Sequence, residues 1–368
     1  MLSVSYARAL VGTRMTHAAA LPRQAMTTAM NDRQTVLPNG LWEPSPLVAV
    51  RLPLDPNYIF SLVATVSDTA AVVALAEARG LSPVAESVLL AIHRGPTGAD
   101  CLGAHCGLAE EALGTILDEL YCAALVDIAS TAPLPVGPCY RHLTAYAQQV
   151  AAALEVPRLR RRITHNDQDA VLRLGAYVEE YHYISAAGSY LARAVAGAST
   201  ARQGRILAEY FSSEYWHDRW VREGLLAAGL APADLDRTQP LPSTLALMNL
   251  LRWMASSDVP SMCVCLGVTE GTPAHGPELA REFGVLRAAA TLPEAVYAPF
   301  EQHAVIDAEH SHGAIFSEVF ADFEWVAPIR LEAMKDTIWQ YWYAFRAYFQ
   351  GIIDYYQGRS SLPLLTFR

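Results

Sequence analysis

Lysine is nearly absent from this 368-residue sequence, which has Lys335 and otherwise relies on arginine for positive charge. The 27 basic residues are outnumbered by 37 acidic residues, so the formal net charge at pH 7 is −10. An acidic chain of this kind is poorly suited to nucleic acid or to an anionic membrane as its main partner. No apolar run has the roughly 20 residues that a membrane-spanning helix requires, so we expect no membrane span.

Cysteine motifs typical of zinc ribbons or disulfide scaffolds are also missing. The six cysteines form no paired CxxC motifs and are too sparse for a disulfide-rich secreted protein. We therefore expect a reducing cytoplasm as the compartment. Four residues of the N-terminal part could supply sulfur and imidazole ligands to zinc. Their spacing along the chain matches no common zinc finger, so we assign them no metal. They are His93, Cys101, His105 and Cys106.

Residues 1–38 lack the sustained apolar core of a secretion signal. They contain Arg8, Arg14 and Arg23, with no acidic residue before Asp32. We expect a disordered tail here, and a transit-like leader or an overlong start assignment are the alternatives.

Residues 39–135 have the pattern of a small α+β domain. Val48–Leu52 and Tyr58–Val66 are rich in β-branched and aromatic residues, which predicts two short strands. Three helices are then predicted over residues 82–93, after Thr97 and over residues 109–122, followed by a strand. This order of elements is typical of a winged helix.

The third of these helices has the wrong charge for reading DNA. Its sequence, AEEALGTILDELYC, contains four acidic residues and no basic one, whereas an approach to phosphates requires positive charge. The strands and helices resemble the small leader-peptide-binding domains found beside enzymes that modify ribosomally made peptides. This resemblance implies a precursor peptide as a partner. A domain that only packs on the enzyme or forms a homodimer is the alternative.

Segment 133–138 is rich in proline and glycine, which predicts a linker. Residues 136–368 are predicted to be almost wholly helical, with about seven helices and no strand pattern among them. The helices span about residues 140–156, 166–197, 202–228, 243–270, 277–290, 294–323 and 328–357. We therefore expect a mainly α protein, in which a helical bundle follows the small α+β domain and can hold a site on facing helices.

A candidate metal-binding face lies on the helix predicted over residues 294–323. His303, Asp307 and His310 occur at i, i+4 and i+7, and at 3.6 residues per turn these positions share one face. Because imidazole and carboxylate are common metal ligands, this face predicts half of a metal site.

Three further residues supply the other half. Glu214 and His217 are spaced i and i+3, which places a carboxylate and an imidazole together, as in helical diiron proteins. Glu270 is the only acidic residue in MCVCLGVTEGTP, at the end of an apolar helix, where a solvated glutamate is the alternative. Three carboxylates and three imidazoles suit iron, with manganese as the alternative.

The order ExxH, single Glu and HxxxDxxH over about residues 165–357 resembles that of the heme-oxygenase-like diiron oxidases, a family of iron-containing redox enzymes. The resemblance implies a heme-oxygenase-like bundle that holds two iron ions. The implied ligands are Glu214, His217, Glu270, His303, Asp307 and His310. Some family members have a longer gap between the first glutamate and the histidine, so Glu209 is an alternative to Glu214 as the first ligand. A ferritin-like site would carry two ExxH helices and is disfavoured.

The same resemblance implies an enzyme that activates O2 with two ferrous ions to oxidise a small-molecule or peptide substrate. We expect the substrate to be an amino-acid-like or peptide-borne group in natural-product biosynthesis. The expected reactions are oxidative decarboxylation, carbon–carbon cleavage and N-oxygenation. The alternatives are a metal-independent bundle, similar to thiaminases or to quinone-cofactor synthases, and a non-catalytic winged-helix regulator.

Several other residues are minor candidates. His182 is expected on a neighbouring helix, where it faces the core or the surface, with the pocket as the alternative. Arg281, Arg287 and Arg346 are candidates to anchor a substrate carboxylate, and none is favoured by its spacing. The aromatic residues within segment 339–349 of the last helix are interpreted as core, and the lining of the substrate cavity is the alternative for some of them.

Overall fold

The computed structural model describes residues 50–55, 57–63, 68–164, 169–270, 281, 283–285, 287–288, 292–309 and 312–366. Within these ranges, the side chains of residues 304, 306–309 and 312–315 are not described. The predicted tail 1–38, much of the predicted helix 277–290 and His310 therefore lie outside the description.

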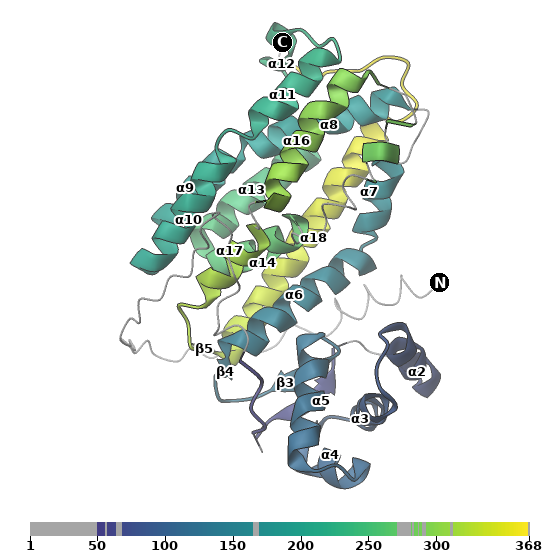
Figure 1. Ribbon diagram of the computed structural model, residues 1–368, viewed down its shortest axis with the longest axis vertical. Coiled ribbons are helices and arrows are strands. Elements are labelled where there is room, and N and C mark those ends of the chain that lie inside the picture. The colour runs from purple at the N-terminus through teal and green to yellow at the C-terminus, as the bar shows by residue number, and fades with distance from the viewer. Residues whose placement is uncertain are drawn as a thin grey trace.

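The N-terminal part of the chain forms a small α+β unit at one end of a helical bundle (Figure 1). Its strand β1 is central in an antiparallel sheet of order β2-β1-β3, with Ile59 opposite Gly98 on one side and Ala129 on the other. The elements are β1 (Ile59–Leu62), α2 (Thr69–Ala78), α3 (Pro83–His93), β2 (Thr97–Gly98), α4 (Ala99–Cys106), α5 (Glu110–Cys122) and β3 (Val126–Ala129).

The predicted helices of this unit are confirmed. Helix α3 begins as expected, because the Ser82 hydroxyl accepts a hydrogen bond from the Ala85 N–H at 3.2 Å and Pro83 occupies the first helical position. The strand expected at Val48–Leu52 is wrong in its described portion, since residues 50–52 join no sheet. Helix α2 was not predicted. It begins after Asp68, whose carboxylate caps it by accepting from the Ala71 N–H at 2.8 Å.

The linker predicted at residues 133–138 is wrong. Residues 134–139 are buried, and β4 (Leu134–Pro135) pairs with β5 (Trp325–Val326) next to the C-terminal helix. Helix α6 (Val136–Ala153) starts at once, and Pro138 is tolerated in its first turn because an N–H there has no helical acceptor. The composition of this segment reflects a strand end and a helix start that are packed in the core.

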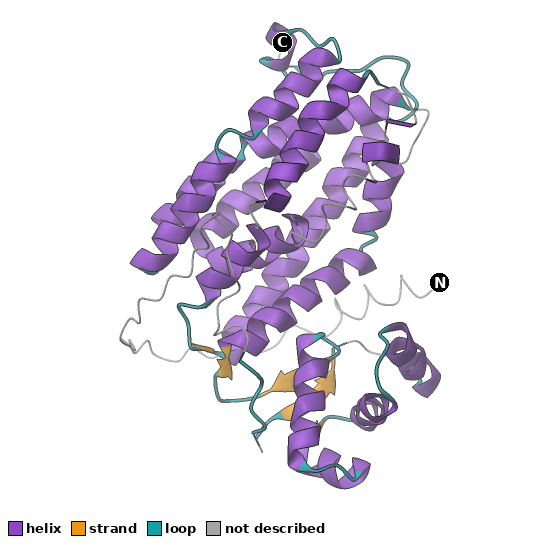
Figure 2. Cartoon of the chain, viewed as in Figure 1, coloured by secondary structure: helices purple, strands orange, loops and turns teal. Residues whose placement is uncertain are grey.

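The remainder of the chain is a helical bundle, so the mainly α prediction is confirmed (Figure 2). Its longest helix, α18, runs through the bundle and is shown in yellow in Figure 1. The helices after α6 are α7 (Val156–Thr164), α8 (Ala170–Ser185), α9 (Ala187–Ala196), α10 (Ala201–Glu214), α11 (Asp218–Ala227), α12 (Pro232–Leu235), α13 (Pro242–Ser257), α14 (Val259–Glu270), α16 (Glu294–Glu309), α17 (His312–Phe320) and α18 (Pro328–Tyr356). None of the described helices has both the length and the apolar character of a membrane span.

Several helices that the periodicity predicted as single are interrupted. Between α13 and α14, Asp258 has φ −152° and ψ 60°, and Pro260 in the next turn has no N–H for a continuous helix. The Asp258 carboxylate accepts hydrogen bonds from the Ser261 hydroxyl at 2.7 Å and from the Arg330 guanidinium at 2.7 Å. The interruption is therefore stabilised by side chains from α14 and α18. Similar breaks divide α8 from α9 and α10 from α11.

The small unit and the bundle share one hydrophobic core, which extends from Leu52 to Tyr356. A buried ion pair crosses the contact between them: the Lys335 ammonium of α18 lies 2.7 Å from both carboxylate oxygens of Asp127 in β3. Beside it, the His142 ring of α6 lies 2.8 Å from the Tyr121 carbonyl and stacks on the Tyr121 ring. The boundary at residues 135 and 136 stays a prediction, but the two parts pack as one body.

Candidate metal centre

The break between α10 and α11 places Glu214 and His217 at the centre of the candidate site. Glu214 is the last residue of α10, and His217 immediately precedes α11. The predicted continuous helix is wrong here, yet Tyr215 and His217 keep helical torsion angles, and the His217 N–H donates to the Glu214 carbonyl at 3.2 Å. The i, i+3 side chains therefore still share a face. The Nδ1 atom of His217 lies 3.1 Å from Oε2 of Glu214.

His303 joins this pair from α16. Its ring centroid lies 4.9 Å from that of His217, at an interplanar angle of 87°. Ligand atoms of Glu214, His217 and His303 all lie within 4.8 Å of one another, which makes them the one such group of metal-ligating side chains in the described part of the chain. Two of the three side chains are well buried, with exposures of 2% for His217 and 11% for Glu214, and His303 is half-buried. Three of the six predicted ligands are thus brought together.

A glycine allows α11 and α16 to approach closely enough for this contact. A Cβ atom at Gly224 would lie 2.6 Å from the Phe300 ring and 3.0 Å from the Val296 carbonyl, distances that an alanine does not tolerate. Gly224 lies two turns after His217, and Val296 lies two turns before His303, so the two helices run antiparallel with matched spacing. Close packing at Gly224 therefore sets the distance between the two histidines.

Glu270, the last residue of α14, is linked to the same site through tyrosines. The Tyr210 hydroxyl of α10 donates a hydrogen bond to Oε1 of Glu270. Burial raises the pKa values of Tyr183, Tyr190 and Tyr210, and the charges of both Glu270 and Glu214 raise them further. Since the two carboxylates act on the same three phenols, Glu270 lies on the Glu214 side of the bundle.

The remaining predicted ligands are less completely described. Asp307 lies on α16, one turn beyond His303, but its side chain falls outside the description, and His310 lies outside it altogether. Both stay predictions. Glu209 is exposed on α10 and is not part of the close group, so the geometry favours Glu214 as the first ligand.

The minor candidates separate from the site. Burial lowers the pKa of His182 to about 4, which keeps its half-buried ring neutral at physiological pH. Arg287 is paired with Glu294 at 2.8 Å and with Glu301, so its guanidinium is already engaged. Arg281 is exposed and Arg346 is half-buried. None of these observations favours a substrate anchor.

The sulfur and imidazole residues of the small unit do not gather in the described structure. Instead, the Arg94 guanidinium lies 2.9 Å from Nε2 of His105, beside a cavity of about 340 Å³ that Cys101 also lines.

The tyrosines around Glu270 were not identified from the sequence. Tyr341 was interpreted as core and is fully buried, but its hydroxyl also lies 2.7 Å from Oγ1 of Thr269, next to Glu270. Trp220 was also missed. It is 8% exposed, and its ring lies 4.9 Å from the His217 ring and 6.1 Å from the His303 ring. Aromatic residues on amphipathic helices have no sequence signal that separates core from site.

The donor set fits an iron ion. Two imidazoles and a carboxylate converge from two helix ends and a facing helix, and two of these three side chains are well buried. Imidazole and carboxylate together suit iron, manganese and zinc better than the sulfur-rich or all-oxygen sets that other metals prefer. A divalent cation would also compensate the largely buried Glu214 carboxylate.

Comparison with known proteins agrees with this chemistry. Residues 176–344 match the family model described as iron-containing redox enzyme, and all six predicted ligands fall within the matched segment. The match supports an oxidoreductase and bound iron, in a heme-oxygenase-like bundle. None of the curated proteins matches the chain.

Solved structures give more distant similarities. A domain of unknown function with a heme oxygenase-like fold from Shewanella denitrificans is 16% identical, with a TM-score of 0.44, over 56% of this chain and 88% of its own. A TenA homolog from Pseudomonas syringae is 14% identical, with a TM-score of 0.43, over 57% and 93%. A TenA family transcription regulator from Silicibacter is 14% identical, with a TM-score of 0.41, over 59% and 98%.

Proposed function

We propose that the protein is a non-heme diiron oxidase or oxygenase that uses O2 to oxidise an amino-acid-like or peptide-borne group in natural-product biosynthesis. One observation carries the proposal: Glu214, His217 and His303 converge from three separate helical segments inside the region that matches iron-containing redox enzymes. Helix periodicity alone does not require these side chains to meet. Their convergence in an enclosed place is what a metal site needs.

Glu214, His217 and His303 would hold iron directly, and Glu270, Asp307 and His310 would complete the set for a second ion. When bound, two ferrous ions supply the electrons that reduce O2 and make it able to oxidise a substrate. The chain itself fixes the ligands. The turn between α10 and α11 holds Glu214 against His217, and Gly224 holds α16 close enough for His303 to reach them.

Aromatic packing keeps water from these ligands. The Trp220 ring lies against both histidine rings, and Tyr190 and Tyr210 are buried beside the two carboxylates. A dry site strengthens each electrostatic contact and protects an oxidising reaction from side reactions with solvent. The aromatic side chains thus support the proposed chemistry without binding metal.

Metal stoichiometry tests the proposal. Protein incubated anaerobically with Fe(II), and then freed of excess metal, should retain about two irons per chain and should consume O2 on exposure to air. His303→Ala should lose at least one iron, because it removes one of three converging ligands. His105→Ala is the matched control, since this exposed histidine of the small unit lies beside Arg94 and far from the ligands in the fold. It should retain both ions.

A wild-type protein that never binds more than one iron would refute the two-iron proposal. Equal iron contents in His303→Ala and wild type would refute the ligand assignment. Substrate turnover by thoroughly iron-free protein would favour the metal-independent alternative.

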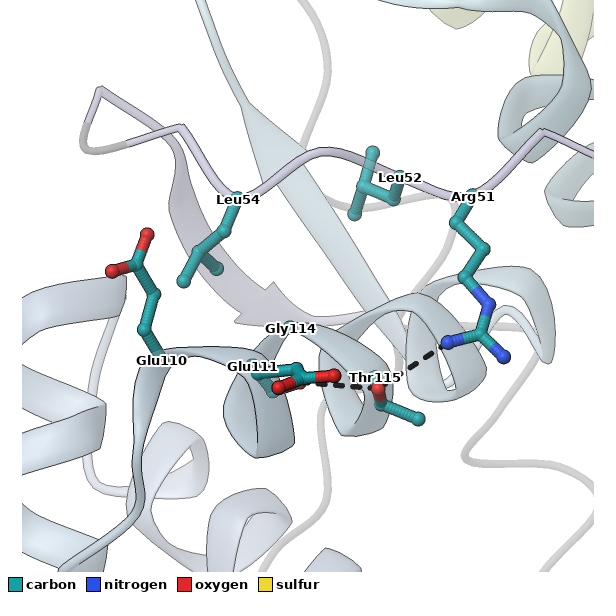
Figure 3. A pocket seen from close by; sticks show the side chains of 7 residues that line it. All are labelled: Arg51, Leu52, Leu54, Glu110, Glu111, Gly114 and Thr115. Carbon is teal, nitrogen blue, oxygen red and sulfur yellow. Dashed lines mark hydrogen bonds between the residues drawn. The ribbon is translucent and has the colours of Figure 1, made fainter.

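We also propose that the small unit is a winged-helix-like domain that binds a precursor peptide. An open cavity of about 430 Å³ lies between residues 51–54 and α5, lined by Leu52 and Leu54 together with Glu110 and Glu111 (Figure 3). Arg51 also lines the cavity, so its two carboxylates leave a net negative charge, and the lining suits a segment that combines an apolar and a basic side chain. Calorimetry with a peptide encoded beside the gene should show binding that Glu111→Arg weakens. Exposed Glu77 on α2 provides the control, and equal affinities of Glu111→Arg and Glu77→Arg would contradict the proposed site.

A further inference from the structure

We infer that Tyr210 is a positioning residue for the metal centre: its hydroxyl holds one oxygen of the Glu270 carboxylate and so fixes the orientation of a side chain that would bind the metal. This inference rests on the proposed function, because it gives Tyr210 a role in a site whose iron occupancy is itself proposed. Tyr210 would act through Glu270 and would not contact the metal.

The first argument is the placement of Tyr210. It lies one turn before Glu214 on α10, so both side chains project from the same face. Its side chain is 1% exposed, and its hydroxyl donates to Oε1 of Glu270. Because an ionised carboxylate can only accept a hydrogen bond, the hydroxyl is the donor in this contact. The contact joins the helix of one proposed ligand to the side chain of another.

The second argument concerns the position of Glu270 at a helix end. As the last residue of α14, it lies where the helix dipole places partial negative charge, which disfavours a carboxylate. A hydrogen bond to a carboxylate is shorter and stronger than a neutral one, so the Tyr210 hydroxyl compensates locally for this disfavoured position.

The third argument is that the surroundings immobilise the tyrosine. The Phe316 ring of α17 packs edge-on against the Tyr210 ring, with centroids 4.9 Å apart and an interplanar angle of 79°. Phe316 is itself held at Gly267 of α14, where a Cβ atom would lie 3.1 Å from its ring. The Tyr210 ring therefore has a fixed position relative to the helix that presents Glu270.

A separate chain of hydroxyls anchors the end of α14. Thr269 Oγ1 donates its only hydrogen to the Cys265 carbonyl at 2.9 Å, so the Tyr341 hydroxyl, 2.7 Å away, must be the donor to Thr269. This network holds the backbone next to Glu270, while Tyr210 holds its carboxylate. The two contacts are distinct and can be tested apart.

Tyr210→Phe tests the inference, because it removes the hydroxyl and keeps the ring. We expect Fe(II) affinity under anaerobic conditions, measured by equilibrium dialysis with metal analysis, to fall about 10-fold to 100-fold for at least one ion, as for other groups that orient metal ligands. Tyr356→Phe is the matched control. The Tyr356 hydroxyl donates to the buried Glu179 carboxylate at 3.0 Å, away from the proposed ligands. Tyr356→Phe should lower the stability of the iron-free protein by a comparable amount, but it should bind Fe(II) with wild-type affinity.

The outcomes are distinguishable. Wild-type affinity in Tyr210→Phe, with two irons bound by the wild type, would overturn the inference and leave the proposed function standing. Equal losses of affinity in both variants would show a general loosening of the bundle and would also overturn it. A wild type that binds no iron would overturn both. If Tyr210→Phe does not fold, Glu270→Gln tests the inference independently. Wild-type stability with unchanged iron binding in Glu270→Gln would overturn it.

Discussion

Lys335→Met tests how the small unit is held on the bundle. The substitution retains most of the apolar stem and removes the ammonium group. In the folded protein this ammonium lies 2.7 Å from both oxygens of Asp127 and 3.2 Å from the Glu332 carboxylate, and the Lys335 residue is 4% exposed. The ion pair joins α18 to β3, which are 208 residues apart in the sequence.

The expected loss of unfolding free energy follows from the buried Asp127 charge that Lys335→Met leaves behind. Removal of one partner from a buried ion pair typically costs about 3–5 kcal/mol, because the other charge is left buried and uncompensated. The Asp127 side chain is 21% exposed, so water relieves part of the penalty. We therefore expect a loss near the lower limit, about 3 kcal/mol, from a total stability on the order of 5–15 kcal/mol.

The pH dependence gives the loss a signature. Burial raises the pKa of Asp127, but the ion pair with Lys335, helped by His142 and the Ile128 N–H, outweighs it and lowers the pKa below its usual value near 3.8. The stabilisation is therefore present above that value and is lost as the pH falls through the folded-state pKa. In Lys335→Met burial prevails and the Asp127 pKa rises, so protonation at acid pH relieves the penalty.

Urea unfolding followed by circular dichroism measures this effect. The difference between wild type and Lys335→Met should be larger at about pH 7 than at about pH 5. A second change, Asp127→Leu, should recover most of the loss, because a buried ion pair replaced by apolar groups is often neutral. Arg158→Met is the control, since its ion pair with Glu155 at 2.9 Å is exposed and contributes little.

Three results would refute the reasoning. They are a loss below about 1 kcal/mol at neutral pH, a loss that does not depend on pH, and a double variant as unstable as Lys335→Met alone. The first would mean that water solvates Asp127 well despite its burial. The third would mean that Lys335 acts through packing, with no role for the pair.

Two further predictions concern buried groups. His142 is fully buried, and burial with the Lys335 charge lowers its pKa to about 3, so below about pH 6.5 the unfolded chain takes up a proton that the folded chain does not. The free energy of unfolding should therefore fall by about 1.4 kcal/mol per pH unit from this group, and acid titration of unfolding in His142→Phe should show a shallower slope. Gly175→Ala should destabilise the protein by about 1–3 kcal/mol, because the new Cβ would overlap the Tyr356 ring. Thermal unfolding should show no such loss for Gly204→Ala, whose Cβ would lie 3.7 Å from its nearest neighbour, and equal losses would contradict the packing argument.

The sequence by itself determined the features that depend on neighbouring residues. The periodicity of apolar residues predicted a helical protein, and the Ser82-Pro83 pair predicted the start of α3 at the correct residue. The i, i+3 spacing placed Glu214 beside His217, and the contact remains although the helix is interrupted between them. Each of these features is set by backbone geometry over a few residues, which sequence spacing records directly.

Only the tertiary structure decided which distant residues meet. The approach of His303 to His217 depends on the absence of a side chain at Gly224, and no local pattern marks that glycine as a packing position. The burial of residues 134–139 and the pairing of Lys335 with Asp127 likewise depend on contacts across the fold. Segment 133–138 has the composition of a linker, but its residues 134–135 form a buried strand because residues 325–326 supply the partner strand. Desolvation and shape decide these contacts, and both are properties of the folded chain.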